Sequence, residues 1–173
     1  HDWYMHWGDL DYLKQQYACL KDTCDLAFSW IDEGFACNAD EMKGFVDWSS
    51  KHSESEEEGR RAVFCMALKK ATKLFEVLED AEYAKKCEKY CEALKQEKID
   101  KKANKRMSAL TVLAERDSRL AKEVLAGNSP KEMSTFMGYY VLKAKAKLGE
   151  HSDALDIIKS YWGAMLDMGA TTF

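Results

Sequence analysis

The stretch ATKLFEVLEDAEYAKKCEKY, residues 71–90, decides the fold. Apolar residues recur every three or four positions before Glu79 and again after Asp80, which is the spacing of one helix face. The side chain of Asp80 is placed to accept hydrogen bonds from the first amides of the second helix. Two helices joined by two residues must lie antiparallel. The sequence therefore predicts an αα-hairpin, with helices over 60–78 and 81–97.

Two further hairpins follow the first along the chain. Periodic segments at 101–114 and 118–126 predict a short pair, and those at 134–148 and 153–168 predict a longer one with Ser152 as the cap of its second helix. The segments within each pair are separated by only a few turn-forming residues. The sequence thus predicts three successive antiparallel hairpins.

The chain before the hairpins predicts two more helical segments and one irregular segment. The residues 1–7 read as the end of a helix that Gly8 breaks, and Asp9 is placed to cap a long amphipathic helix over 10–33. Residues 35–58 are expected to form an irregular loop. In this loop, residues 44–48 have short-strand character, and the acidic run at its end is expected to be solvated and to lead into the next helix.

Composition agrees with an all-α protein. The 173 residues include one proline and nine glycines, are 46% hydrophobic and 32% charged, and are expected to form a single, partial domain. The net charge is -4 with acids and bases interspersed, so no nucleic-acid partner is expected. No apolar run approaches the roughly 20 residues that span a bilayer, so no membrane partner is expected either. The first residues resemble neither a signal peptide nor a methionine start, and the chain ends on an apolar residue, so we expect a piece of a longer protein.

The six cysteines form no CxxC pair. Cys87 and Cys91 lie one helical turn apart, and Cys65 lies within a helical apolar pattern. No nearby histidine completes a compact zinc site, and the four histidines share no motif. Buried thiols are the favoured interpretation, because cysteine behaves as a small apolar residue, and a disulfide remains the alternative. No metal or cofactor is expected.

Four segments together resemble one enzyme family. The last, YWGAMLDMGATTF at 161–173, is similar to the W-G-x-M-L-x-x-G-A-T-T-F-W-E segment of bacterial α-L-rhamnosidases of glycoside hydrolase family 78. The segment STFMGYYVL at 134–142 resembles the family's penultimate helix, and FVDW at 45–48 resembles its F-x-D-W segment. The residues WGD at 7–9, with the tyrosines that follow, resemble a G-D stretch that opens an earlier helix. The four segments occur in the family's order over nearly the whole chain.

The resemblance implies an (α/α)6 barrel, a ring of six helical hairpins of which this chain would supply about half. It also implies inverting hydrolysis of terminal α-L-rhamnosides, in which one carboxylic acid protonates the leaving oxygen and one carboxylate activates water. The family's general base would lie two residues beyond Phe173 and its general acid upstream of His1. No catalytic residue is therefore assigned within this chain, and the chain alone is expected to be inactive.

The resemblance also suggests residues that line the sugar site. Asp47 and Trp48 would contact the sugar, by hydrogen bonds and by stacking, although the same residues would also suit a strand that anchors the loop. The aromatic residues of the penultimate helix have helical spacing, which is typical of core residues as well as of a binding cleft. Two threonines near the end would support the strand that carries the missing base. The weaker candidates for substrate contact and the supporting residues are Phe136, Tyr139, Tyr140, Thr171 and Thr172.

A different class of function also fits three hairpins. A non-catalytic helical scaffold could bind protein or carbohydrate through an aromatic-lined face. A half ring would in addition leave apolar surface exposed where the missing hairpins pack, so we expect self-association. In the enzyme interpretation, the partner is a rhamnose-containing glycan.

Overall fold

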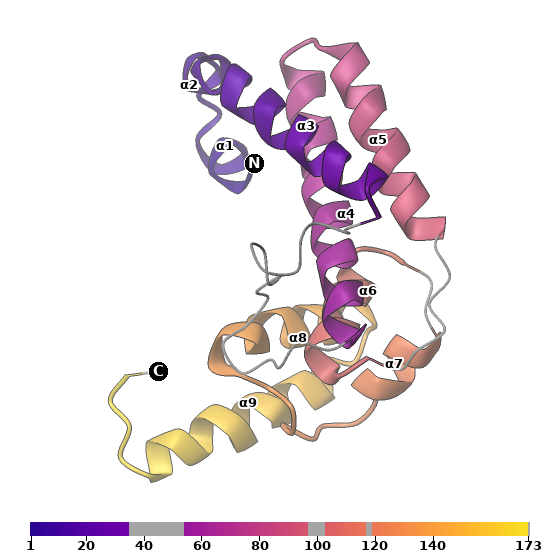
Figure 1. The fold of residues 1–173 in the computed structure, drawn as a ribbon. Coiled ribbons are helices and arrows are strands. Elements are labelled where there is room, and N and C mark those ends of the chain that lie inside the picture. The colour runs from indigo at the N-terminus through magenta and orange to yellow at the C-terminus, as the bar shows by residue number, and fades with distance from the viewer. Residues whose placement is uncertain (35–53, 97–102, 117–118, 173) are drawn as a thin grey trace. The chain divides into compact units, whose positions relative to one another are not determined.

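The computed structural model describes residues 1–34, 54–96, 103–116 and 119–172 (Figure 1). Within these ranges the regular structure is helical and contains no strand, which confirms the predicted all-α class. The described residues group into two compact units. Unit 1 takes its residues from His1–Lys43 and Val63–Glu97, and unit 2 from Gly44–Ala62 and Lys98–Phe173. The closed six-hairpin ring and the single partial domain stay predictions.

Unit 1 begins with three helices: α1 (Asp2–Trp7), α2 (Leu10–Gln15) and α3 (Tyr17–Asp32). The predicted end of the first helix at Gly8 and the predicted cap of the next helix at Asp9 are both confirmed. Gly8 has φ 67°, a left-handed conformation that glycine adopts without a steric penalty. The carboxylate of Asp9 accepts a hydrogen bond from the amide of Tyr12 at 2.9 Å. These local signals set the start of α2.

The first predicted hairpin is formed by α4 (Glu54–Val77) and α5 (Ala81–Gln96). Asp80 accepts the amide hydrogen bond of Tyr83 at 3.1 Å and so caps α5, as expected. Near the turn, the rings of Phe75 and Tyr83 lie 5.1 Å apart, and farther from it the sulfur atoms of Cys65 and Cys91 lie 3.0 Å apart. The two contacts establish the antiparallel arrangement.

The prediction of one helix over 10–33 is wrong, because it is divided at Gln16 into α2 and α3. The amide of Gln16 donates hydrogen bonds to the carbonyls of both Tyr12 and Leu13, and the ψ angle of Gln16 is 0°. No glycine or proline marks this point in the sequence. Leu13 is buried and Tyr17 donates a hydrogen bond to Asp80, so tertiary contacts hold the chain on both sides of the break.

The prediction of an irregular loop over 35–58 is wrong at its end, because α4 already begins at Glu54. Acidic residues favour the first turns of a helix, where they interact with its dipole. Glu58 is moreover not a solvated charge, since it accepts a hydrogen bond at 2.6 Å from the fully buried guanidinium of Arg116. The rest of the predicted loop and its strand-like segment lie outside the described residues.

Unit 2 contains the start of α4 and the two other predicted hairpins. Their boundaries differ slightly from the prediction: Asn104 caps the first helix through the amide of Met107, and Glu150, not Ser152, precedes the last helix. Ser152 lies inside that helix and caps nothing, because the tight turn at Gly149 leads directly into it. The four helices are α6 (Lys105–Leu113), α7 (Arg119–Leu125), α8 (Thr135–Lys147) and α9 (His151–Asp167).

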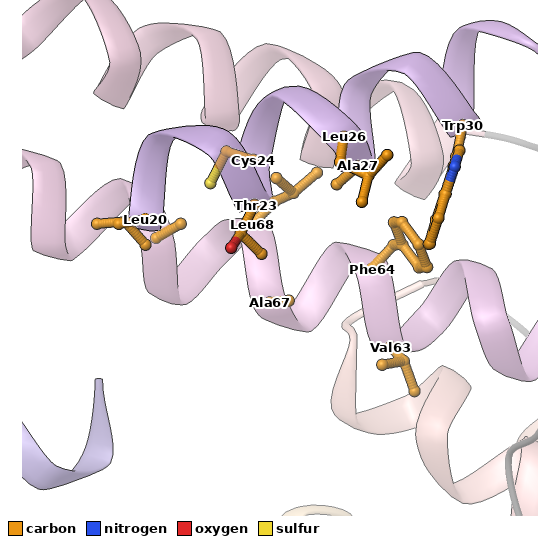
Figure 2. A pocket seen from close by; sticks show the side chains of 11 residues that line it. Leu20, Thr23, Cys24, Leu26, Ala27, Trp30, Val63, Phe64, Ala67 and Leu68 are labelled. Carbon is orange, nitrogen blue, oxygen red and sulfur yellow. The ribbon is translucent and has the colours of Figure 1, made fainter. Parts of the chain in front are cut away.

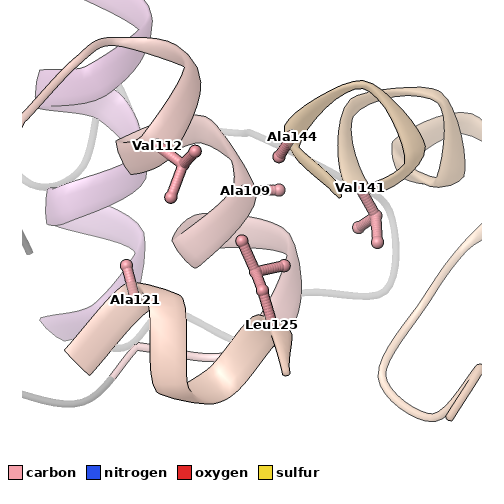
Figure 3. Close-up of a cluster of buried hydrophobic side chains, with 6 residues drawn as sticks. All are labelled: Ala109, Val112, Ala121, Leu125, Val141 and Ala144. Carbon is pink, nitrogen blue, oxygen red and sulfur yellow. The ribbon is translucent and has the colours of Figure 1, made fainter. Parts of the chain in front are cut away.

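Helix α6 is the centre of unit 2. It packs against both α7 and α8, and α8 packs in turn against α9. Residues 105–112 are all buried, which is typical of a helix enclosed by its neighbours. Figure 3 shows the cluster of buried side chains at the junction of α6, α7 and α8, which consists of Ala109, Val112, Ala121, Leu125, Val141 and Ala144.

Candidate functional site

The three aromatic candidates on α8 form one cluster in unit 2. The ring of Tyr140 lies 5.9 Å from that of Phe136 and 5.2 Å from that of Tyr139, both at edge-to-face angles. Phe136 is 63% exposed and Tyr139 is 59% exposed, whereas Tyr140 is half-buried against the core cluster. Two of the three rings are therefore surface residues and not core residues.

Local sequence fixes where this aromatic cluster lies. The hydroxyl of Ser134 accepts a hydrogen bond from the amide of Met137 at 3.1 Å and so sets the first turn of α8. Met137 and Val141 point into the core, which turns Phe136 and Tyr139 outward. The ammonium group of Lys143, one turn on, donates a hydrogen bond to the hydroxyl of Tyr139 at 3.3 Å.

A close contact joins α8 and α9 at Gly138, which lies between Phe136 and Tyr139 in the sequence. A β-carbon at Gly138 would lie 2.6 Å from atom Cη2 of Trp162. The indole thus lies directly against the α8 backbone, in space that only glycine leaves open. The ring of Tyr161 lies 5.0 Å from the indole at an edge-to-face angle. Aromatic side chains of both helices therefore meet at this part of the hairpin.

Ion pairs of a buried lysine with two partly exposed carboxylates hold the other end of the same hairpin. The fully buried ammonium group of Lys145 lies 2.7 Å from the carboxylate of Glu150 and 3.5 Å from that of Asp153. Burial lowers the pKa of nearby Lys105, and the positive charge of Lys145 acts in the same direction. These charges pair within the protein, so their geometry indicates a structural role.

The resemblance also suggests two further pairs of residues for the sugar site. Asp47 and Trp48 lie outside the described residues. Thr171 and Thr172 are exposed and follow the end of α9. Gly169, at φ 88°, turns the chain out of the helix just before them. Their supporting role stays a prediction.

Unit 1 contains an apolar pocket that the sequence did not indicate. It lies between α3 and α4 and has a volume of about 330 Å³. Figure 2 shows Leu20 near one end and the rings of Trp30 and Phe64 at the other, where their centroids are 5.8 Å apart. Val63 and Ala67 are exposed on α4 and line this pocket. The lining residues are Leu20, Thr23, Cys24, Leu26, Ala27, Trp30, Val63, Phe64, Ala67, Leu68 and Ala71.

Unit 1 also contains an open polar cleft of about 790 Å³ beside the α4–α5 turn. The hydroxyl of Tyr17 donates to Asp80 at 2.6 Å, and this hydrogen bond lowers the pKa of the Asp80 carboxyl. The hydroxyl of Tyr83 donates to Asp25 at 2.8 Å and lowers the pKa of that carboxyl. The ammonium group of Lys21 lies 4.1 Å from the centroid of the Tyr83 ring. Sequence reasoning identified Asp80 only as a cap, because its tyrosine partner is distant in the chain.

No protein-family model matches the chain, and neither the search of curated proteins nor that of solved structures finds a match. Among the described residues, no group of three or more histidine, cysteine, aspartate or glutamate side chains is placed to hold a metal ion. None of the helices described is both long and apolar enough to cross a membrane.

Proposed function

We propose that this chain is part of the six-hairpin catalytic domain of a glycoside hydrolase that resembles bacterial α-L-rhamnosidases. The observation that carries the proposal is the end of α9. The segment WGAMLDMG at 162–169 completes this helix, and Gly169 then turns the chain out of it. In the family segment that this stretch resembles, the chain leaves the helix at the same point, because the general base follows just after the sequence ATTF.

Two further observations support a carbohydrate ligand. Helices α8 and α9 form a hairpin, as the resemblance to the family's last two helices requires. The exposed rings of Phe136 and Tyr139 offer flat apolar surface on which the C–H groups of a sugar can stack, and the hydroxyl of Tyr139 adds a polar group. The substrate class we propose is a glycan with terminal rhamnose.

The chain alone is expected to be inactive in this proposal. Inverting hydrolysis needs two carboxyl groups about 6.5–9.5 Å apart, one as general acid and one as general base. The resemblance assigns neither to residues 1–173. Asp47 would contribute to sugar binding only, since a single carboxylate cannot perform both steps.

The test compares residues 1–173 with the full gene product on 4-nitrophenyl α-L-rhamnoside. We expect release of 4-nitrophenol by the full gene product only. Activity in neither protein would overturn the proposal for this substrate.

A binding measurement tests the aromatic cluster separately. Saturation-transfer NMR with L-rhamnose on residues 1–173 should give signals that the double variant Phe136→Ala/Tyr139→Ala loses. Trp7→Ala is the matched control, because Trp7 is a 74% exposed aromatic residue of unit 1. An equal loss in both variants would argue against a sugar site on α8.

The second candidate function is a non-catalytic helical scaffold, and the pocket between α3 and α4 favours it. Its lining is almost entirely apolar, and an apolar pocket of this size suits a small apolar ligand or the apolar side chains of a protein partner. Rhamnoside hydrolysis by the full gene product would argue against this function. Absence of hydrolysis by the full gene product would favour it.

A further inference from the structure

Four buried cysteines of unit 1 lie in two pairs along α5. Cys87 and Cys91 are one turn apart on that helix, as the sequence indicated. The sulfur of Cys87 lies 4.0 Å from that of Cys24 on α3. The sulfur of Cys91 lies 3.0 Å from that of Cys65 on α4. Helix α5 thus faces a thiol on each of its two neighbours.

The pair of Cys65 and Cys91 is nearly at bonding distance. A disulfide has a sulfur–sulfur length of about 2.05 Å, so closure requires the two atoms to approach by only about 1 Å. The sulfur of Cys91 also lies 3.4 Å from the carbonyl oxygen of Cys65, and that of Cys65 lies 3.7 Å from the carbonyl oxygen of Cys91. The two residues therefore face each other directly across the α4–α5 hairpin.

We propose that Cys65 and Cys91 form a redox-sensitive pair that closes to a disulfide between α4 and α5 when the protein meets a small peroxide. Nothing in the glycosidase proposal requires this pair, so either proposal can be refuted without affecting the other. The oxidant is hydrogen peroxide, which is small enough to reach thiols inside a helical unit during local opening.

The chemistry balances in two steps. The Cys91 thiolate attacks one oxygen of hydrogen peroxide, the O–O bond breaks, and the departing hydroxide takes up a proton to become water. The Cys65 thiolate then attacks the sulfur of the resulting sulfenic acid. The new sulfur–sulfur bond forms as hydroxide leaves and is protonated to a second water. In total, two thiols lose two electrons and two protons, and one peroxide becomes two waters.

Cys91 acts as the first nucleophile in this proposal. The hydrogen bond with the Cys65 thiol lowers the pKa of Cys91, and the positive charge of Lys95, one turn along α5, acts in the same direction. A lower pKa increases the thiolate fraction, which is the form that reacts. The opposite holds for Cys87, whose pKa is raised by its hydrogen bond to Cys24 and by burial.

Trypsin separates all four thiols, which makes the pair easy to identify. Cleavage after lysine and arginine places Cys65 in AVFCMALK (62–69) and Cys91 in YCEALK (90–95). Cys87 falls in CEK (87–89) and Cys24 in a peptide that begins at Asp22. The folded chain is treated with limiting peroxide, blocked with N-ethylmaleimide, digested without reductant and analysed by mass spectrometry.

The expected product is the cross-linked peptide pair of 62–69 and 90–95, with a mass about 2 Da below the sum of the two thiol peptides. Cys91→Ala should abolish it, and Cys24→Ala should leave it in place. The same oxidation in guanidinium chloride should yield mixed pairings, because only the fold selects Cys65 for Cys91. The proposal is overturned if the folded wild type yields mixed pairings too, or if the 62–69 and 90–95 peptides remain fully blocked by maleimide. Because the wild type alone decides between these outcomes, a variant that fails to fold does not weaken the test.

Discussion

The indole of Trp162 on α9 lies against the backbone of Gly138 on α8, so that a β-carbon at Gly138 would be 2.6 Å from atom Cη2 of the ring. Real β-carbons do not approach other heavy atoms this closely. The contact joins the two helices that carry the aromatic residues of unit 2. The absence of a side chain at one position thus decides where a large ring on another helix can lie.

The first prediction concerns this contact. Gly138→Ala should lower the free energy of unfolding by about 1–3 kcal/mol, because the added methyl group displaces the indole. Urea denaturation, followed by tryptophan fluorescence, measures the effect. The matched control is Gly163→Ala on α9, where a β-carbon meets nothing within 4 Å. That variant should gain roughly 0.5–1 kcal/mol from the better helix propensity of alanine. A loss of the same size in both variants would contradict the packing argument.

The second prediction compares two ion pairs that involve neighbouring lysines of α8. Lys145 is fully buried beside Glu150, whereas Lys147 and Glu115 are both more than a third exposed. Glu150→Gln should cost about 1–2 kcal/mol of unfolding free energy, because it leaves a buried cation with weaker compensation. Lys147→Gln should change it by less than about 0.5 kcal/mol. Thermal and urea unfolding of both variants provide the measurement, and equal effects would show that burial does not distinguish the pairs.

The third prediction concerns acid stability at the α4–α5 turn. The hydrogen bond from Tyr17 holds the pKa of Asp80 below its ordinary value of 3.8. The stabilisation is therefore present above pH 3.8 and is lost as the pH falls through the lower, folded-state pKa. Tyr17→Phe should raise the pKa of Asp80 toward 3.8 and make the loss of stability in acid shallower.

Carbon-13 NMR titration of the aspartate carboxyl groups checks this third prediction. Tyr83→Phe is the matched control, because the hydrogen bond from Tyr83 acts on Asp25 instead. The first variant should move mainly the Asp80 titration and the second mainly that of Asp25. If neither titration moves, the tyrosine hydrogen bonds do not set these pKa values.

The fourth prediction is self-association. Helix α9 exposes Leu155, Ile158 and Leu166, which recur at helical spacing along one face. An exposed apolar stripe of this kind favours association with another surface of similar character. We expect light scattering to give an average mass that rises with concentration. Leu155→Glu/Leu166→Glu should reduce the rise, whereas Met5→Glu on α1, an exposed apolar residue outside the stripe, should not. A monomer at all concentrations would refute the expectation.

The sequence by itself determined most of the helices, their hairpin pairing and the caps at Asp9 and Asp80. Asp9 and Asp80 act on amides three residues away, so their effect can be read without knowing the fold. Apolar spacing likewise depends only on helix geometry. These features are local, and local rules were sufficient to predict them.

Tertiary structure alone decided the features that join distant residues. Three features depend on the packing of other helices against the residues concerned. They are the break at Gln16, the ion pair of Glu58 with Arg116 and the outward position of Tyr139. Periodicity shows that Tyr139 lies on a helix, but only the placement of α6 beneath α8 decides that its ring faces solvent. The thiol pair of Cys65 and Cys91 spans 26 residues and exists only because α4 and α5 are antiparallel in one particular register. Such contacts depend on how the side chains of different helices pack together. The spacing of residues along a single helix carries no information about that packing.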